Sequence, residues 1–131
     1  MFIDASAIIA IIAQEEGWES LASRLSQAPR TLVSALSAWE AVIGLAREAQ
    51  IPFEQAEALV DQFVEETGAE MVEIGAAIGR EAIQASRLYG RGRHRAGLDF
   101  GDCFAYACAK VSRVPLLFKG NDFVHTDILV G

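Results

Sequence analysis

The 131-residue sequence has few cysteines and no long apolar run, and these two scarcities exclude several classes of protein. Cys103 and Cys108 are five residues apart in a helical pattern, a spacing that fits neither a zinc pair nor a redox CxxC motif. We expect two buried thiols in a reducing cytoplasm. No apolar run approaches the ~18 residues that a membrane-spanning helix needs. Residues 5–13 are expected to form a buried helix and not a signal peptide, because Asp4 and no basic residue precedes them.

Positive charge is also scarce, and its distribution is uneven. The net charge is −7, but residues 1–79 alone carry −10, whereas residues 80–131 carry +3. Such an acidic chain is not expected to coat nucleic acid indiscriminately. A basic C-terminal half can still present a local phosphate-binding face, because salt screens distant charges more than near ones. The charge pattern therefore suits a selective enzyme.

The chain lacks linkers, repeats and low-complexity tracts, and 52% of its residues are hydrophobic. A chain of this length can bury a core without disulfides or structural metal. We therefore expect one globular domain over residues 1–131.

Short apolar runs alternate with amphipathic helical patterns along the chain. This alternation, without hairpin signals, predicts an α/β fold with a parallel sheet covered by helices on both faces. In such sheets, ligands collect at the carboxyl ends of the strands. Strands are expected at residues 1–3, 31–33, 70–74 and 115–118, with a further short strand near 128–130, and helices at 5–14, 18–28, 37–49, 53–67, 76–89 and 102–112.

Four carboxylates lie where an apolar run gives way to a turn or a helix. They are Asp4, Glu40, Asp102 and Asp122. Asp4 follows the first predicted strand and Asp122 follows the last, so both belong to one edge of the sheet. Acids gathered at one place repel one another until a cation neutralises them. Hard oxygen ligands suit Mg²⁺ or Mn²⁺, so the pattern indicates metal-dependent phosphate chemistry.

Simpler structural roles are open for the first two acids. Asp4 is equally suited to cap the helix that follows it. Ser6 is a candidate to cap that helix, to support Asp4, or to contact a metal-bound water at the substrate site. Ser37 and Glu40 match the S-x-x-E capping box, which in isolation is the favoured interpretation.

The other two acids have alternatives as well. Either Asp99 or Asp102 can cap the helix that begins near residue 102, where the helix dipole favours acids. The aromatic flanks of Asp102, Phe100 among them, suggest that it is buried. Asp122 lies in a turn-prone string, as does Asp127, which we rank lower. Singly each alternative is reasonable, but four acids converging on one edge favour a shared site.

The loop at residues 90–97 supplies positive charge. Arg91, Arg93 and Arg95 stand among glycines and are candidates to hold the phosphates of a nucleic acid substrate, although a solvated loop is the alternative. His94 is a weak candidate for a general base. No strand leads into this glycine-rich stretch, so it is no dinucleotide fingerprint.

Several runs of the sequence together resemble the PIN-domain ribonucleases, and within them the VapC toxins of bacterial toxin–antitoxin pairs. The runs are residues 2–7, the helix of Glu40, residues 94–107, residues 115–123, and Thr126-Asp127. The resemblance extends over the whole chain and is densest at residues 90–128. One departure is Asp99, which stands where this subfamily leads us to expect asparagine. It adds a charge near Asp102 and is a candidate to join the metal site or to cap the helix.

The resemblance implies a three-layer α/β/α sandwich and a cytoplasmic, Mg²⁺- or Mn²⁺-dependent endoribonuclease. It implies that Asp4, Glu40, Asp102 and Asp122 form the catalytic, metal-binding site. Asp4 and Asp102 would be the principal ligands. It also implies an RNA substrate, a cognate antitoxin that blocks the acidic pocket, and a homodimer.

Two other classes of protein fit less well, and one alternative stays open. A phosphoacceptor receiver needs adjacent acids after strand one, but Ala5 follows Asp4. A dehalogenase-like phosphatase needs a second Asp at position six, which is Ser6. The open alternative is a catalytically silent PIN-like domain that binds only RNA or a partner.

Overall fold

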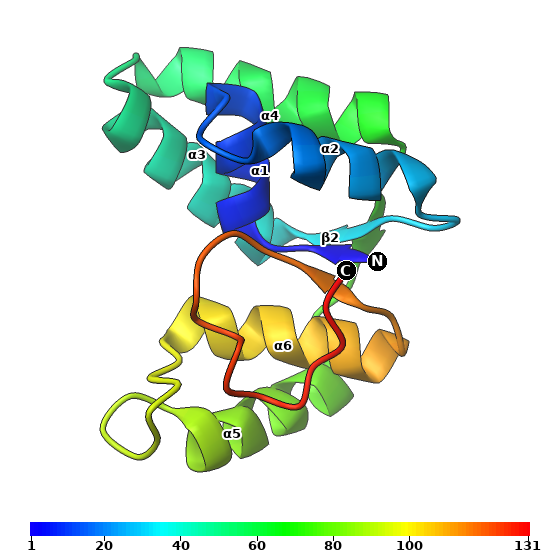
Figure 1. The fold of residues 1–131 in the computed structure, drawn as a ribbon, viewed down its shortest axis with the longest axis vertical. Coiled ribbons are helices and arrows are strands. Elements are labelled where there is room, and N and C mark those ends of the chain that lie inside the picture. The colour runs from blue at the N-terminus through cyan, green and yellow to red at the C-terminus, as the bar shows by residue number, and fades with distance from the viewer.

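Four short strands form one parallel sheet at the centre of the molecule (Figure 1). The computed structural model describes residues 1–131. The strand order is β3-β2-β1-β4, and all neighbouring strands are parallel, as predicted. The strands are β1 (Phe2–Ile3), β2 (Leu32–Ser34), β3 (Glu70–Val72) and β4 (Leu116–Leu117).

Six helices cover the two faces of this sheet, which confirms the predicted α/β/α sandwich. In Figure 1, α1 to α4 lie above the sheet and α5 and α6 lie below it. None of these helices combines the length and apolarity needed to cross a bilayer. The helices are α1 (Ala5–Ala13), α2 (Trp18–Gln27), α3 (Ala35–Ala49), α4 (Phe53–Thr67), α5 (Ala76–Tyr89) and α6 (Phe100–Ser112).

The strands divide the core into two layers because successive side chains of a strand point to opposite faces. The first residues of β1, β2 and β4 pack with α5 and α6, and the next residue of each strand packs with α1 to α4. All six side chains are almost completely buried, which explains why strands of only two or three residues read as continuous apolar runs. The two sets are Phe2, Leu32 and Leu116, and Ile3, Val33 and Leu117.

The start of α3 corrects one prediction. Ser34, not Ser37, caps this helix, since its hydroxyl oxygen accepts a hydrogen bond from the Ser37 backbone N–H at 3.1 Å. The helix therefore begins two residues earlier than predicted, and the expected Ser37–Glu40 capping box does not form. Glu40 is consequently free of any capping role.

Other boundaries shift by one or two residues. Helix α6 begins at Phe100, which is 64% exposed, and Asp102, which we expected to be buried, is half-buried. Near the C-terminus, the possible final strand is reduced to a single parallel bridge between Leu116 and Val130. The helices at α4 and α5 have the predicted limits.

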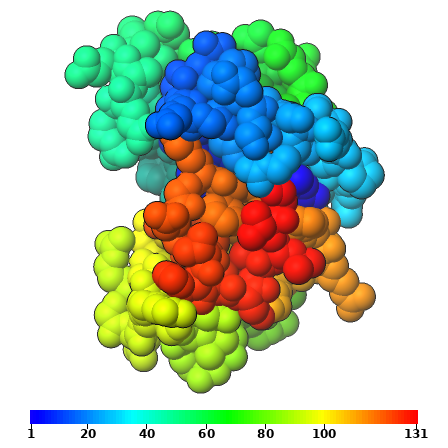
Figure 2. Space-filling view, in the orientation of Figure 1, coloured from blue at the N-terminus to red at the C-terminus, as the bar shows by residue number.

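The C-terminal segment is tied to α6 by a small polar cluster. The Tyr106 hydroxyl donates a hydrogen bond to Asp127 at 2.6 Å, and the Lys110 ammonium lies 2.6 Å from the other carboxylate oxygen of Asp127. Phe123 packs on Phe118, and its side chain is buried. Figure 2 shows this segment lying across the α6 side of the molecule. The cluster accounts for Asp127, which lies outside the acidic cleft described below.

Candidate active site

A cleft of about 560 Å³ lies where the parallel strands end, between α1, α3 and the start of α6. Four different segments of the chain supply its carboxylates: Asp4 at the end of β1, Glu40 on α3, Asp102 on α6 and Asp122 after β4. The structure thus brings the four predicted acids to one cleft. Asp99, Glu15 and Glu48 line it too.

Asp4 forms the most buried part of the cleft, with only 6% of its surface exposed. Its backbone N–H donates to the Leu117 carbonyl of the neighbouring strand at 2.9 Å, which fixes its position at the sheet edge. One carboxylate oxygen accepts hydrogen bonds from the backbone N–H of Ser6 at 3.0 Å and from its hydroxyl at 2.5 Å. Asp4 therefore caps α1, as one alternative held, and also faces the cleft.

The Ser6 hydroxyl links two sides of the cleft. It donates to Asp4 and accepts a hydrogen bond from the Lys119 backbone N–H at 3.0 Å. The loop that carries Asp122 is thereby held next to Asp4, although the Asp122 side chain itself is exposed. Both hydrogen-bonding roles of the hydroxyl are in use, which favours a positioning role for Ser6.

Asp99 and Asp102 form a reciprocal capping box at the start of α6. The Asp99 carboxylate accepts from the Asp102 backbone N–H at 2.9 Å, and the Asp102 carboxylate accepts from the Asp99 backbone N–H at 3.1 Å. Asp99 is the capping residue, so its unexpected charge has a structural role. Only one carboxylate oxygen of Asp102 is used, and the side chain still lines the cleft.

The Glu40 carboxylate lies directly against the backbone of Gly101 in the first turn of α6. A Cβ atom at position 101 would lie 2.5 Å from the Glu40 carboxyl carbon and nearer still to one of its oxygens. Gly101 is fully buried, and only a residue without a side chain allows this approach of α3 to α6. The sequence gives no local signal for this contact, because the two residues are far apart in the chain.

The carboxylates of the cleft disfavour one another's charge. Burial raises the pKa of Asp4, and the charges of Asp122 and Asp99 add to the rise, against hydrogen bonds from Ser6. Burial, with repulsion from Asp4 and Asp99, raises the pKa of Glu40 to about 7. Burial likewise raises the pKa of Asp102 to about 8, with added repulsion from the neighbouring acids. The cleft therefore holds negative charge that the protein leaves uncompensated.

Two cationic side chains line the cleft, but neither pairs with these acids. The Lys119 ammonium lies 3.3 Å from Glu15, and the Arg47 guanidinium lies 3.9 Å from Glu48. Sequence analysis did not single out Arg47 or Lys119. Arg47 stands seven residues after Glu40, two helical turns along the same face of α3, and this spacing was a usable signal.

The predicted arginines are not part of the cleft lining. Arg91, Arg93 and Arg95 are exposed on the loop between α5 and α6. That loop is closed by a hydrogen bond from the Arg91 backbone N–H to the Leu98 carbonyl at 3.1 Å. Any contact of these arginines with a substrate would thus lie outside the acidic cleft.

The carboxylates of the cleft are chemically suitable ligands for a divalent cation. All four candidate ligands are carboxylates, and burial together with mutual repulsion opposes the ionised forms of three of them. As placed, no three acidic, histidine or cysteine side chains converge closely enough to hold a metal ion. The acids surround the cleft at separate positions. Glu40 rests on Gly101, and Asp102 accepts a hydrogen bond from the Asp99 backbone N–H.

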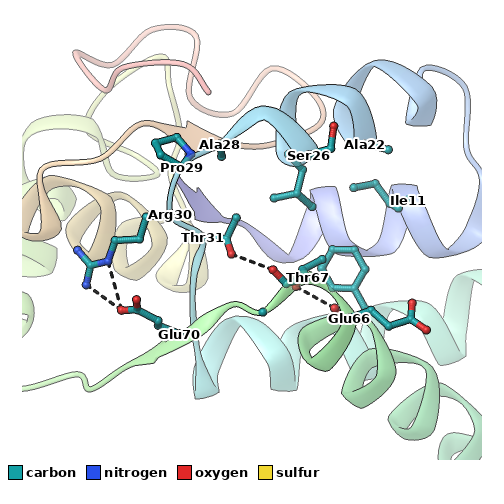
Figure 3. A pocket seen from close by; sticks show the side chains of 13 residues that line it. Ile11, Ala22, Ser26, Ala28, Pro29, Arg30, Thr31, Glu66, Thr67 and Glu70 are labelled. Atoms are coloured by element: carbon teal, nitrogen blue, oxygen red, sulfur yellow. Dashed lines mark hydrogen bonds and ion pairs between the residues drawn. The ribbon is translucent and has the colours of Figure 1, made fainter.

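A second cleft of about 560 Å³ lies between α1, α2 and α4 and has a different character (Figure 3). Its charged side chains include Arg30 and Glu70, which pair with each other at 2.9 Å. The Thr31 hydroxyl donates to the Thr67 carbonyl at 3.3 Å. These polar groups satisfy one another, and Glu66 is the one lining carboxylate without a cationic partner, so this cleft lacks the cluster of acids that defines the acidic cleft.

The chain matches one family model and is similar to several known proteins. A PIN domain family model matches residues 1–129. A VapC ribonuclease of Rhizobium meliloti (strain 1021) is 42% identical, with 97% of this chain and 98% of that protein covered. Ribonuclease VapC30 of Mycobacterium tuberculosis is 39% identical, with 98% and 95% covered.

Solved structures show the same fold at low identity. Mycobacterium tuberculosis VapC20, described as a sarcin–ricin loop cleaving toxin, has a TM-score of 0.75 at 16% identity, covering 98% of this chain and 95% of that one. A chain of a toxin–antitoxin complex from Klebsiella pneumoniae has a TM-score of 0.71 at 16% identity, covering 99% and 95%.

Proposed function

Because the chain belongs to the PIN-domain family, and to the VapC ribonucleases within it, we propose that it is an endoribonuclease toxin whose acidic cleft hydrolyses RNA phosphodiester bonds. The observation that carries the proposal is the gathering of four carboxylates from four segments, with uncompensated charge, at the carboxyl edge of the sheet. The basis for a divalent cation is the same excess of carboxylate charge, and Mg²⁺ or Mn²⁺ is the proposed ion.

Each carboxylate has a proposed role. Asp4 and Asp102 are the principal ligands of the cation, and Glu40 and Asp122 bind it or orient the attacking water. A bound Mg²⁺ or Mn²⁺ would supply an acidified water and offset the charge that develops on the scissile phosphate. Ser6 holds Asp4 in place through its 2.5 Å hydrogen bond.

The loop arginines are proposed to extend the RNA contact beyond the cleft. Arg91, Arg93 and Arg95 are exposed and carry no acidic partner within salt-bridge distance. Substituting one of them by alanine is expected to weaken the binding of all RNA sequences alike. The slope of the logarithm of the binding constant against the logarithm of the salt concentration should fall by about the contribution of one phosphate contact. An unchanged salt slope in all three variants would show that the loop is only solvated.

The partners follow from the same family membership. We propose a cognate antitoxin that occludes the acidic cleft, in keeping with the toxin–antitoxin complex of the Klebsiella pneumoniae neighbour. We also propose that the toxin acts as a homodimer in the cytoplasm.

The test is cleavage of total cellular RNA by the purified protein with Mg²⁺, Mn²⁺ or EDTA. Discrete fragments that require metal and disappear in Asp4→Asn are the expected result. Asp61→Asn, an exposed residue of α4 outside the cleft, is the matched control and should cleave like the native protein. A folded protein that binds RNA but never cleaves it would identify a catalytically silent PIN domain instead.

A further inference from the structure

Trp39 is a large aromatic side chain that lines the acidic cleft and remains open to solvent. It precedes Glu40 on α3, and 58% of its surface is exposed. It takes part in none of the aromatic pairs of the molecule and in no cation–π contact. The indole therefore has no partner within the chain.

Two further residues on the same face of α3 also line the acidic cleft. Ile43 and Arg47 continue the cleft wall along α3, one and two turns after Trp39. Arg47 has 75% of its side chain exposed and only a long 3.9 Å contact with Glu48. With a rise of about 1.5 Å per residue, Arg47 lies roughly 12 Å along the helix from Trp39. An aromatic surface, a cation able to bind phosphate and the proposed catalytic residue Glu40 thus lie along one helix at the edge of the cleft.

This combination is the one by which proteins hold unpaired nucleotides. Every base offers a π-face to an aromatic side chain, whereas cations contact the backbone. In a duplex the base faces are covered by their neighbours, so an indole reaches them only on an unpaired strand. RNA is itself anionic, so its phosphates would need Arg47 and the proposed cation in order to approach the carboxylates of the cleft.

We propose that Trp39 stacks on an unpaired base next to the phosphate held in the acidic cleft, while Arg47 contacts a neighbouring phosphate. The inference rests on the proposed function and adds to it the residues that hold the base and the phosphate next to the cleavage site. Trp39 is then a specificity residue that touches substrate without taking part in the chemistry.

The chain contains only two tryptophans, Trp18 and Trp39, which allows each indole to be observed alone. In the Trp18→Phe variant, Trp39 is the sole indole, and in Trp39→Phe the sole indole is Trp18. Both are made in an Asp122→Asn background, which keeps the two proposed principal ligands Asp4 and Asp102. Each is titrated, with Mg²⁺ present, with a 12-nucleotide single-stranded RNA of mixed sequence and with its duplex. We expect the single strand to quench Trp39 fluorescence but not Trp18 fluorescence, and the duplex to quench neither.

Affinity and kinetics supply a second readout. The Trp39→Ala variant cannot stack on a base, and this loss should raise the Kd for the single-stranded RNA by about tenfold or more. On cleaved RNA it should raise KM more than it lowers kcat, and Trp39→Phe should retain most of the affinity. The control is Ile83→Ala, which changes an exposed apolar residue of α5 outside the cleft and should change neither value.

Unchanged single-strand affinity in Trp39→Ala, or equal quenching of both indoles, would overturn the proposal, as would an effect confined to antitoxin binding. The outcome is separable from that of the proposed function. Quenching of Trp39 without any cleavage by the native chain supports the RNA subsite and contradicts the nuclease. Metal-dependent cleavage that is unchanged in Trp39→Ala supports the nuclease and contradicts the RNA subsite.

Discussion

Replacing Gly101 by alanine should inactivate the protein without unfolding it. The added methyl carbon would lie 2.5 Å from the Glu40 carboxyl carbon, whereas ordinary van der Waals contact begins near 3.4 Å. The carboxylate must therefore retreat by about 1 Å, which it can do because it is the end of a flexible side chain. Misplacement of a catalytic group by 1 Å costs about 100-fold in rate, or about 2.7 kcal/mol of transition-state stabilisation.

Stability should move little in the same variant. Alanine is a better helix former than glycine by up to about 1 kcal/mol, and this gain offsets part of the cost of displacing Glu40. We expect the free energy of unfolding in urea to stay within about 1 kcal/mol of the native value. Circular dichroism and kcat/KM on the same preparation measure both quantities.

Gly79→Ala is the matched control, because position 79 lies in α5 and an added Cβ there meets nothing within 4 Å. It should keep full activity. In a Glu40→Gln background, Gly101→Ala should add little further loss, since both changes act on one carboxylate. Full activity of a folded Gly101→Ala variant would refute the importance of the Glu40 position.

Three further predictions concern the charges and packing around the cleft. Burial, with added repulsion between the acids, raises the pKa of Glu40 to about 7 and that of Asp102 to about 8, so the folded state binds more protons than the unfolded chain. The melting temperature in EDTA should therefore fall as the pH rises from about 5 to 8, and a rising curve would contradict these raised pKa values. Mg²⁺ should raise the melting temperature of the native protein, and Asp4→Asn should lose most of that gain; equal gains would exclude Asp4 as a ligand. Tyr106→Phe, which removes the hydrogen bond to Asp127, should lower the free energy of unfolding by about 1 kcal/mol in urea titrations and leave RNA cleavage intact, whereas lost cleavage would tie this cluster to the site.

The order of strands and helices could be predicted because each strand is a short apolar run with a clear break on either side. Burial of alternate side chains on the two faces of the sheet makes runs such as Phe2–Ile3 apolar throughout. Strand topology then places Asp4 and Asp122 at one edge, and this needs no knowledge of side-chain contacts.

What depends on tertiary contact could not be predicted in the same way. The capping box assigned to Ser37 and Glu40 was wrong because Ser34, buried at the end of β2 and three residues before Ser37, caps the helix instead. The local sequence pattern alone does not decide between these two serines. Phe100 is exposed because it stands in the first turn of α6, at the protein surface. The approach of Glu40 to Gly101 joins segments sixty residues apart, and no sequence pattern records it.

The location of the cation is the most direct test of the account. Crystals grown with Mn²⁺ and measured for anomalous scattering would show where the ion binds. We predict a strong peak in the acidic cleft, bounded by Asp4 and Asp102 with Glu40 or Asp122 beside it, and no such peak in Asp4→Asn crystals. A saturating Mn²⁺ concentration that leaves the cleft without a peak, or places the ion elsewhere, would contradict the central claim.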